Sequence, residues 1–86
     1  MEFDKLKAVI AGVLSVDPNE ITEEETFVED LGADSLDLFQ IVAGIEEVFG
    51  LKVPPEEAEK MTKVGEALQW IKHAVTEKEQ AEHDNA

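Results

Sequence analysis

The chain has 86 residues, no cysteine and a formal net charge of -14, from 21 acidic residues against 7 lysines. This length suits one small domain, and the lack of cysteine excludes disulfides and thiolate metal sites. A surface of this charge repels the phosphates of nucleic acids and of anionic membranes, so we expect neither as a partner.

The first predicted helix runs from Glu2 to Leu14, because apolar residues recur there at the i, i+3, i+4, i+7 spacing of one buried face. Asp17-Pro18-Asn19 is typical of a turn and ends this segment. Residues 16–33 then form a long connection. We expect it to be pinned to the core by four spaced apolar side chains: Ile21, Phe27, Val28 and Leu31.

The second predicted helix covers about residues 35–49. Gly32 permits a turn before it, Asp34 suits the N-cap, and Gly50 suits the position after the last turn. Asp37 lies in the first turn, where an acid complements the helix dipole. The face expected to pack on the core comprises Leu38, Ile41, Val42, Ile45, Val48 and Phe49.

Two further helices complete the domain. Pro54-Pro55-Glu56-Glu57 favours the start of a short helix that ends near Lys60. Thr62 is expected to cap a fourth helix, whose inner face comprises Val64, Ala67, Leu68, Ile71 and Val75. Residues 76–86 lack apolar periodicity, so we expect a disordered acidic tail. The prediction is an all-α, antiparallel four-helix bundle over residues 1–75, with three longer helices, one short helix and a long first loop.

The sequence shows little sign of a membrane segment, a targeting segment or a metal site. No stretch is long and apolar enough to span a bilayer, and the first residues lack the features of signal and transit peptides, which predicts a cytoplasmic protein. The acid-rich stretch from Asp17 to Glu29 lacks the glycine and the spacing of a calcium loop. We therefore predict no dedicated metal site, although clustered carboxylates can bind divalent cations loosely.

Acidic residues are concentrated in the middle of the chain. Residues 8–51 contain no lysine and carry eleven acids. This distribution indicates a docking surface for basic proteins, although solubility alone could also explain it.

The second helix has a further apolar stripe. Leu36, Phe39 and Ala43 fall nearly opposite its core face on a helical wheel. Three acids surround the stripe: Asp37, Glu46 and Glu47. A small bundle buries one broad face of each helix, so this stripe indicates an interaction site. The alternative is that Phe39 folds under the long loop as part of the core.

Ser35 begins the second helix, and by itself its position is explained by helix capping. Catalysis by Ser35 is disfavoured because a serine nucleophile needs a nearby base. The two histidines, His73 and His83, lie in the last helix and the tail. We therefore predict that the chain is not an enzyme.

The run Asp30-Leu31-Gly32-Ala33-Asp34-Ser35-Leu36-Asp37 closely resembles the attachment motif of acyl carrier proteins. The likeness extends over about residues 3–72, including the helix order and the long first loop. It implies that a Mg²⁺-dependent transferase moves 4′-phosphopantetheine from coenzyme A to Ser35, beside Asp34 and Leu36. It also implies that the thiol of this arm carries acyl chains as thioesters, which fits a chain without cysteine.

The resemblance also implies two surfaces. The first docks basic enzymes and would comprise Asp34, Leu36, Asp37, Phe39, Ala43, Glu46 and Glu47. The second is a cavity for the acyl chain, and its expected lining is Ile45, Phe49, Val53, Ala58, Met61 and Leu68. Ordinary core packing could equally explain the second set.

Three residues depart from the family pattern. Gln40 replaces an acid, Phe39 is larger than the usual aliphatic residue, and Gly44 costs about 1 kcal/mol of helix stability relative to alanine. They leave the choice of partners open. The residues before Ser35, Gly32-Ala33-Asp34, resemble the corresponding residues of carriers in fatty-acid synthesis. We therefore expect a monomeric carrier for that pathway. The alternatives are a carrier for a specialised, polyketide-like pathway and an unmodified acidic binding module.

Overall fold

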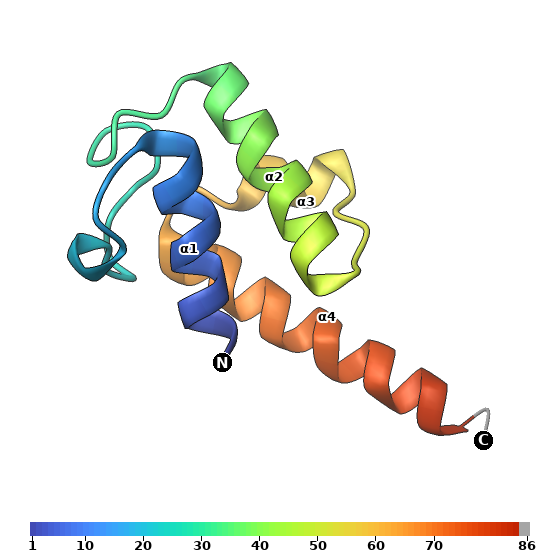
Figure 1. The fold of residues 1–86 in the computed structure, drawn as a ribbon. Helices are drawn as coiled ribbons and strands as arrows, with labels where there is room; N and C mark the ends of the chain where they lie inside the picture. The colour runs from blue at the N-terminus through green and yellow to red at the C-terminus, as the bar shows by residue number, and fades with distance from the viewer. Residues whose placement is uncertain (85–86) are drawn as a thin grey trace.

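The computed structural model describes the backbone of residues 1–84 and the side chains of residues 1–78. Within that part, the only β pairing is an isolated bridge between Thr26 and Lys63. The predicted all-α fold and its long first loop are therefore confirmed (Figure 1). The α-helices of the described residues are α1 (Glu2–Leu14), α2 (Ser35–Phe49), α3 (Pro55–Lys60) and α4 (Val64–Asp84).

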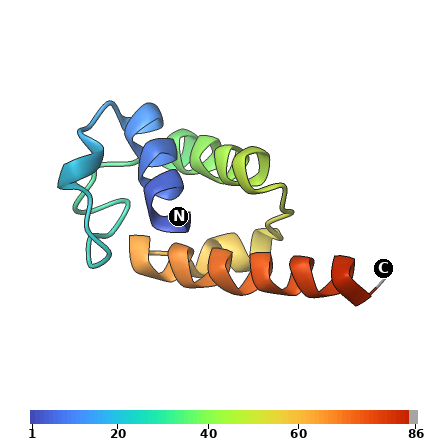
Figure 2. The same ribbon diagram turned by 60° about the horizontal axis from the view of Figure 1, so that its bottom comes forward.

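The helices form two layers (Figure 2). Helices α1 and α2 lie side by side in one layer and run in opposite directions, while α3 and α4 form the other layer. The apolar faces of both layers meet in one core, which accounts for most of the stability that a domain of this size can gain. The buried core residues are Leu6, Ile10, Ile21, Phe27, Ala33, Ile41, Ile45, Val53, Val64, Ala67, Leu68 and Ile71.

The core face of α2 largely follows the prediction. Ile41 and Ile45 are buried, and Leu38, Val42 and Phe49 pack partly buried against the core. The last predicted member needs a correction, because the side chain of Val48 is 47% exposed. Val48 stands at the edge of the apolar arc in the last turn of α2, where part of its surface meets solvent.

Helices α1 and α2 approach each other closely at Gly44. A Cβ atom at Gly44 would lie 2.7 Å from Cγ1 of Val9 on α1. Contacts this short do not occur between carbon atoms in packed proteins. The loss of helix propensity at Gly44 is therefore offset by the close packing of two helices, which the sequence did not reveal.

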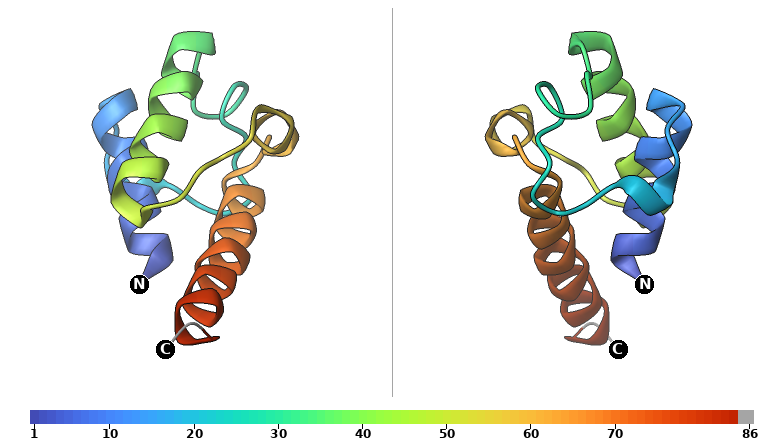
Figure 3. Two further views of the ribbon diagram at one scale, coloured as in Figure 1. Left: turned by 90° about the vertical axis from the view of Figure 1, so that its right-hand side faces the viewer. Right: turned by 90° about the vertical axis from the view of Figure 1, so that its left-hand side faces the viewer.

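The first loop is anchored to the junction between α3 and α4. It contains the 3-10 helix η1 (Pro18–Glu20) and then passes beside that junction (Figure 3). The amide N–H of Phe27 donates to the carbonyl oxygen of Thr62 at 3.1 Å, and the N–H of Val64 donates to that of Glu25 at 3.0 Å. The backbone of the loop is thus held at a fixed position relative to α4.

Three of the four predicted anchors hold this loop. Ile21 and Phe27 are buried, and Leu31 packs partly buried against the core. The prediction that Val28 is an anchor is wrong, because its side chain is 57% exposed. It follows Phe27 in a tight turn, and adjacent side chains there point in different directions.

Helix α4 is longer than the sequence indicated. We expected the helix to end near Val75 and residues 76–86 to be disordered, but α4 continues to Asp84 (Figure 1). Glu, Lys, Gln and Ala are strong helix formers, so this stretch extends the helix without an apolar face. Lys78 Nζ also donates to the carbonyl oxygen of Gly50 at 2.9 Å. Residues 85–86 of the predicted tail lie outside the described residues.

Length alone does not make α4 a membrane span. It has 21 residues, yet its mean hydropathy is low. None of the helices in the described part of the chain is both long and apolar enough to cross a bilayer.

Candidate functional site

The turn that leads into α2 is rigidly bonded. The Thr26 N–H donates to Asp30 Oδ2 at 2.8 Å, and the Asp30 N–H donates to Thr26 Oγ1 at 3.1 Å. The Ala33 N–H donates to the Phe27 carbonyl at 2.9 Å, and both side chains are buried. Gly32 has a φ of 73°, which suits a residue without a Cβ. Sequence reasoning missed the Thr26–Asp30 pair, whose only signal is a threonine four residues before an aspartate.

Helix α2 begins with a reciprocal cap. Asp34 Oδ1 accepts a hydrogen bond from the Asp37 N–H at 2.8 Å, and Asp37 Oδ2 accepts one from the Asp34 N–H at 3.1 Å. This capping box confirms Asp34 as the N-cap and satisfies two backbone donors. Asp37 therefore does more than complement the helix dipole, because its carboxylate closes the box.

The cap leaves Ser35 without a structural task. Ser35 is the first residue of α2 and is exposed. Among the side chains of residues 1–78, none forms a hydrogen bond with Ser35 Oγ. The capping explanation for Ser35 is therefore wrong, because Asp34 caps the helix. An exposed hydroxyl at the positive end of a helix favours a phosphodiester at this position.

The second stripe of α2 is exposed to solvent. The Leu36 side chain is 64% exposed and that of Phe39 is 74% exposed, so Phe39 does not fold under the loop. Asp34, Ala43 and Glu47 are exposed as well. Leu36, Phe39, Ala43 and Glu47 thus share one side of α2, and Asp34 stands at its N-terminal end.

Glu46 and Asp37 differ from the other predicted docking residues. Both are half-buried. Glu46 Oε2 accepts a hydrogen bond from the Val53 N–H at 2.9 Å, so this carboxylate holds the loop between α2 and α3. Each of these two acids therefore has a structural role that the sequence pattern did not reveal.

The six residues predicted to line an acyl cavity all belong to the core or pack against it. Ile45, Val53 and Leu68 are buried core residues, and the other three pack partly buried against the core: Phe49, Ala58 and Met61. This arrangement agrees equally with ordinary packing and with a cavity that opens when an acyl chain enters.

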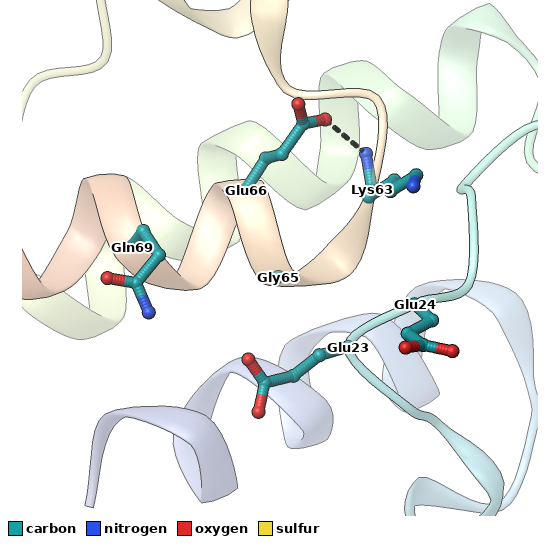
Figure 4. Close-up of a pocket in the computed structure, with 6 residues that line it drawn as sticks. All are labelled: Glu23, Glu24, Lys63, Gly65, Glu66 and Gln69. Carbon is teal, nitrogen blue, oxygen red and sulfur yellow. Dashed lines mark hydrogen bonds between the residues drawn. The ribbon is translucent and has the colours of Figure 1, made fainter.

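A surface depression lies elsewhere, where the first loop meets the start of α4 (Figure 4). Its lining is Glu23, Glu24, Lys63, Gly65, Glu66 and Gln69. Sequence reasoning did not identify it, because it combines segments about 40 residues apart. Glu66 Oε1 accepts hydrogen bonds from the Lys63 N–H and the Thr62 hydroxyl, at 2.9 and 2.7 Å, which gives this acid a structural role. The prediction that Thr62 caps the fourth helix is therefore wrong, because α4 begins two residues later, at Val64, and the Thr62 hydroxyl donates to the Glu66 side chain. No group of three potential metal ligands occurs within the described residues.

A helical domain with an exposed serine at the start of its second helix has the form of a carrier domain. Residues 4–71 match the family model described as the phosphopantetheine attachment site. The chain is 49% identical over 69 residues to an acyl carrier protein of Wolinella succinogenes, which covers 80% of this chain and 91% of that protein. It is 46% identical over 72 residues to one of Clostridium acetobutylicum, which covers 84% and 94%.

The chain therefore belongs to the acyl carrier protein family. Its prosthetic group is 4′-phosphopantetheine. The residues present fit this group, because the Ser35 hydroxyl is exposed and is free of the helix cap.

Proposed function

We propose that Ser35 bears the 4′-phosphopantetheine arm and that the chain carries acyl intermediates of fatty-acid synthesis. The observation that supports this most strongly is that residues other than Ser35 cap the start of α2. Asp34 and Asp37 cap the helix, and the neighbouring Ser35 hydroxyl is left exposed. A hydroxyl that stabilised the helix would be less available for modification.

The surrounding residues each have a part in this function. The positive end of the α2 dipole stabilises the negative phosphodiester on Ser35. Leu36 is an apolar contact beside the arm for partner enzymes. The arm supplies the reactive thiol, since the chain has no cysteine. To carry an acyl chain, the protein therefore needs only to hold the arm on Ser35 and to present it to partner enzymes.

We further propose that the chain is not itself a catalyst and acts in the cytoplasm. Activation of Ser35 as a nucleophile would need a base that accepts its proton. His73 lies on α4, and its Nε2 is 3.0 Å from Glu77 Oε1. The partner enzymes supply the chemistry, and the concentrated acids of residues 17–47 attract their basic surfaces.

Attachment is tested by intact mass spectrometry. The unmodified chain is incubated with coenzyme A, Mg²⁺ and a broad-specificity phosphopantetheinyl transferase. We expect a mass gain of one phosphopantetheinyl group, and none in Ser35→Ala. Ser15 is the only other serine and has a φ of 58°, so Ser15→Gly is the matched control and should be loaded fully. A folded wild type that gains no mass would indicate the unmodified binding module.

The pathway is tested with the loaded chain. In a reconstituted fatty-acid synthesis system supplied with malonyl-CoA, we expect saturated acyl thioesters of increasing length on the thiol of the arm that Ser35 bears. If an established fatty-acid carrier is elongated and this chain is loaded but not elongated, the specialised pathway is the better assignment.

A further inference from the structure

The C-terminal end of α2 has no positively charged residue of its own. Its last turn contains no basic side chain and carries two acids, Glu46 and Glu47. A negative charge is unfavourable there, because the C-terminal end of a helix is the negative end of its dipole. Gly50 follows the helix in the left-handed conformation, with a φ of 64°. Its carbonyl oxygen has no partner within the helix.

Helix α4 supplies a donor for this carbonyl. It passes the C-terminal end of α2, and Lys78 Nζ donates to the Gly50 carbonyl oxygen at 2.9 Å (Figure 1). The ammonium group lies 2.7 Å from the position that a Cβ atom at Gly50 would occupy, so a residue without a side chain leaves room for it. Lys78 shares one stripe of α4 with Ile71 and Val75, at the spacing i, i+4, i+7. The polar extension of α4 therefore places a positive charge at the end of α2.

This contact also fixes the connection between α2 and α3, which comprises residues 50–53. The Leu51 N–H donates to the Glu46 carbonyl oxygen at 3.1 Å, and the Val53 N–H donates to Glu46 Oε2 at 2.9 Å. These two bonds hold the connection to α2, and the bond from Lys78 holds it to α4. The Val53 side chain is buried in the core. Separation of α2 from α4 at this end of the core therefore requires the bond from Lys78 to break.

We propose that the Lys78–Gly50 hydrogen bond is a latch, which closes the end of the core opposite Ser35 and opens when a long acyl chain enters. Ser35 begins α2 and Gly50 follows its last turn, so the two are about 22 Å apart along the helix axis. A short chain leaves the connection in place, whereas a chain that reaches the connection must separate α2 from α4. The latch thus opposes the entry of long chains. This inference rests on the proposed function and on the predicted acyl cavity, and it adds a residue that distinguishes acyl chains by length.

The test measures hydrogen exchange at the Leu51 and Val53 amides, which report local opening of the connection. Lys78→Met removes the ammonium group but keeps an unbranched side chain of similar helix propensity. Lys72→Met is the matched control, because Lys72 is an exposed lysine of the same helix, about 120° from Lys78 around its axis. Each protein is measured with a free arm, with a butanoyl arm and with a hexadecanoyl arm. Intact mass and circular dichroism confirm that each sample is loaded and folded.

With a free arm, we expect Lys78→Met to speed exchange at both amides about fivefold, as for the loss of one ordinary hydrogen bond. The Phe27 amide, which donates to the Thr62 carbonyl oxygen away from the connection, should be unchanged and is the internal reference. In the wild type, the hexadecanoyl chain should speed exchange in the connection by a similar factor, and the butanoyl chain should not. In Lys78→Met the hexadecanoyl chain should add little, because the latch is already absent. Lys72→Met should resemble the wild type throughout.

The proposal is overturned if Lys78→Met exchanges no faster than Lys72→Met with a free arm. It is also overturned if the hexadecanoyl chain leaves exchange in the wild type unchanged, or if it speeds exchange equally in Lys78→Met. A chain that gains no arm at Ser35 refutes the proposed function instead. In that case, the exchange of the unmodified variants still shows whether Lys78 holds the connection.

Discussion

Replacing Gly44 with alanine separates helix propensity from helix packing. Considered by itself, α2 should gain about 1 kcal/mol, because alanine is the better residue in a helix interior. The added methyl group, however, would lie 2.7 Å from Val9 Cγ1 and 3.7 Å from Val9 Cγ2. Valine is branched at Cβ and has few rotamers with which to move away.

The expected outcome is a net loss of stability. Overpacking a close helix contact costs about 1–3 kcal/mol. After the gain in propensity, Gly44→Ala should lower the free energy of unfolding by about 1 kcal/mol. For a domain of this size, that loss lowers the Tm by about 4–8 °C. Circular dichroism during thermal and urea unfolding measures both quantities.

Gly12 is the matched control. It lies within α1, is exposed, and a Cβ atom there would have no neighbour within 4 Å. Gly12→Ala should therefore raise the free energy of unfolding, by up to about 1 kcal/mol. In a Val9→Ala background, Gly44→Ala should become stabilising as well, because the clashing methyl groups are gone. If Gly44→Ala stabilises the wild type as Gly12→Ala does, the packing argument is refuted.

Two further substitutions test acids that the structure assigns to local contacts. The pKa of Glu66 is held below its ordinary value of 4.5, first by the hydrogen bond from the Thr62 hydroxyl and then by the backbone N–H groups of Lys63 and Thr62. Folding lowers this pKa, so the stabilisation is present above pH 4.5 and is lost as the pH falls through the folded value. The Tm difference between the wild type and Glu66→Gln should thus shrink in acid, and a difference that grew would contradict the assignment. Glu46→Ala removes the hydrogen bond to the Val53 N–H. This loss should lower the free energy of unfolding by about 1 kcal/mol and speed hydrogen exchange at the Val53 amide. Unchanged exchange would indicate that Glu46 serves docking alone.

Local signals in the sequence were sufficient for α1, for α2 and for the start of α3. Apolar spacing predicted α1 and α2, and Pro54-Pro55 predicted the start of α3. Asp34 was identified as the N-cap because a cap depends on residues within one turn. The exposure of Phe39 followed from the wheel, since one helix of a small bundle cannot bury both of its apolar stripes.

These local signals could not predict features that depend on contacts between distant segments or on the local backbone geometry. Apolar periodicity could not show that α4 continues past Val75. The residues after Val75 are polar, and they are helical because of their intrinsic helix propensity. It also could not show that Val28 faces solvent, since the turn geometry decides which of two adjacent apolar side chains is buried. The exposure of Val48 likewise depends on how far the neighbouring elements cover the end of α2.

The sequence by itself determined the helix order, the acidic character and the serine at the start of α2, because each depends on composition or on neighbours within a few residues. Only the tertiary structure shows that the Val9 side chain packs against Gly44 and that the Glu46 carboxylate bonds to the Val53 N–H. It also shows that the first loop is hydrogen-bonded to Thr62. Those contacts join residues far apart in the chain or in different elements. They exist only once the helices have packed against one another.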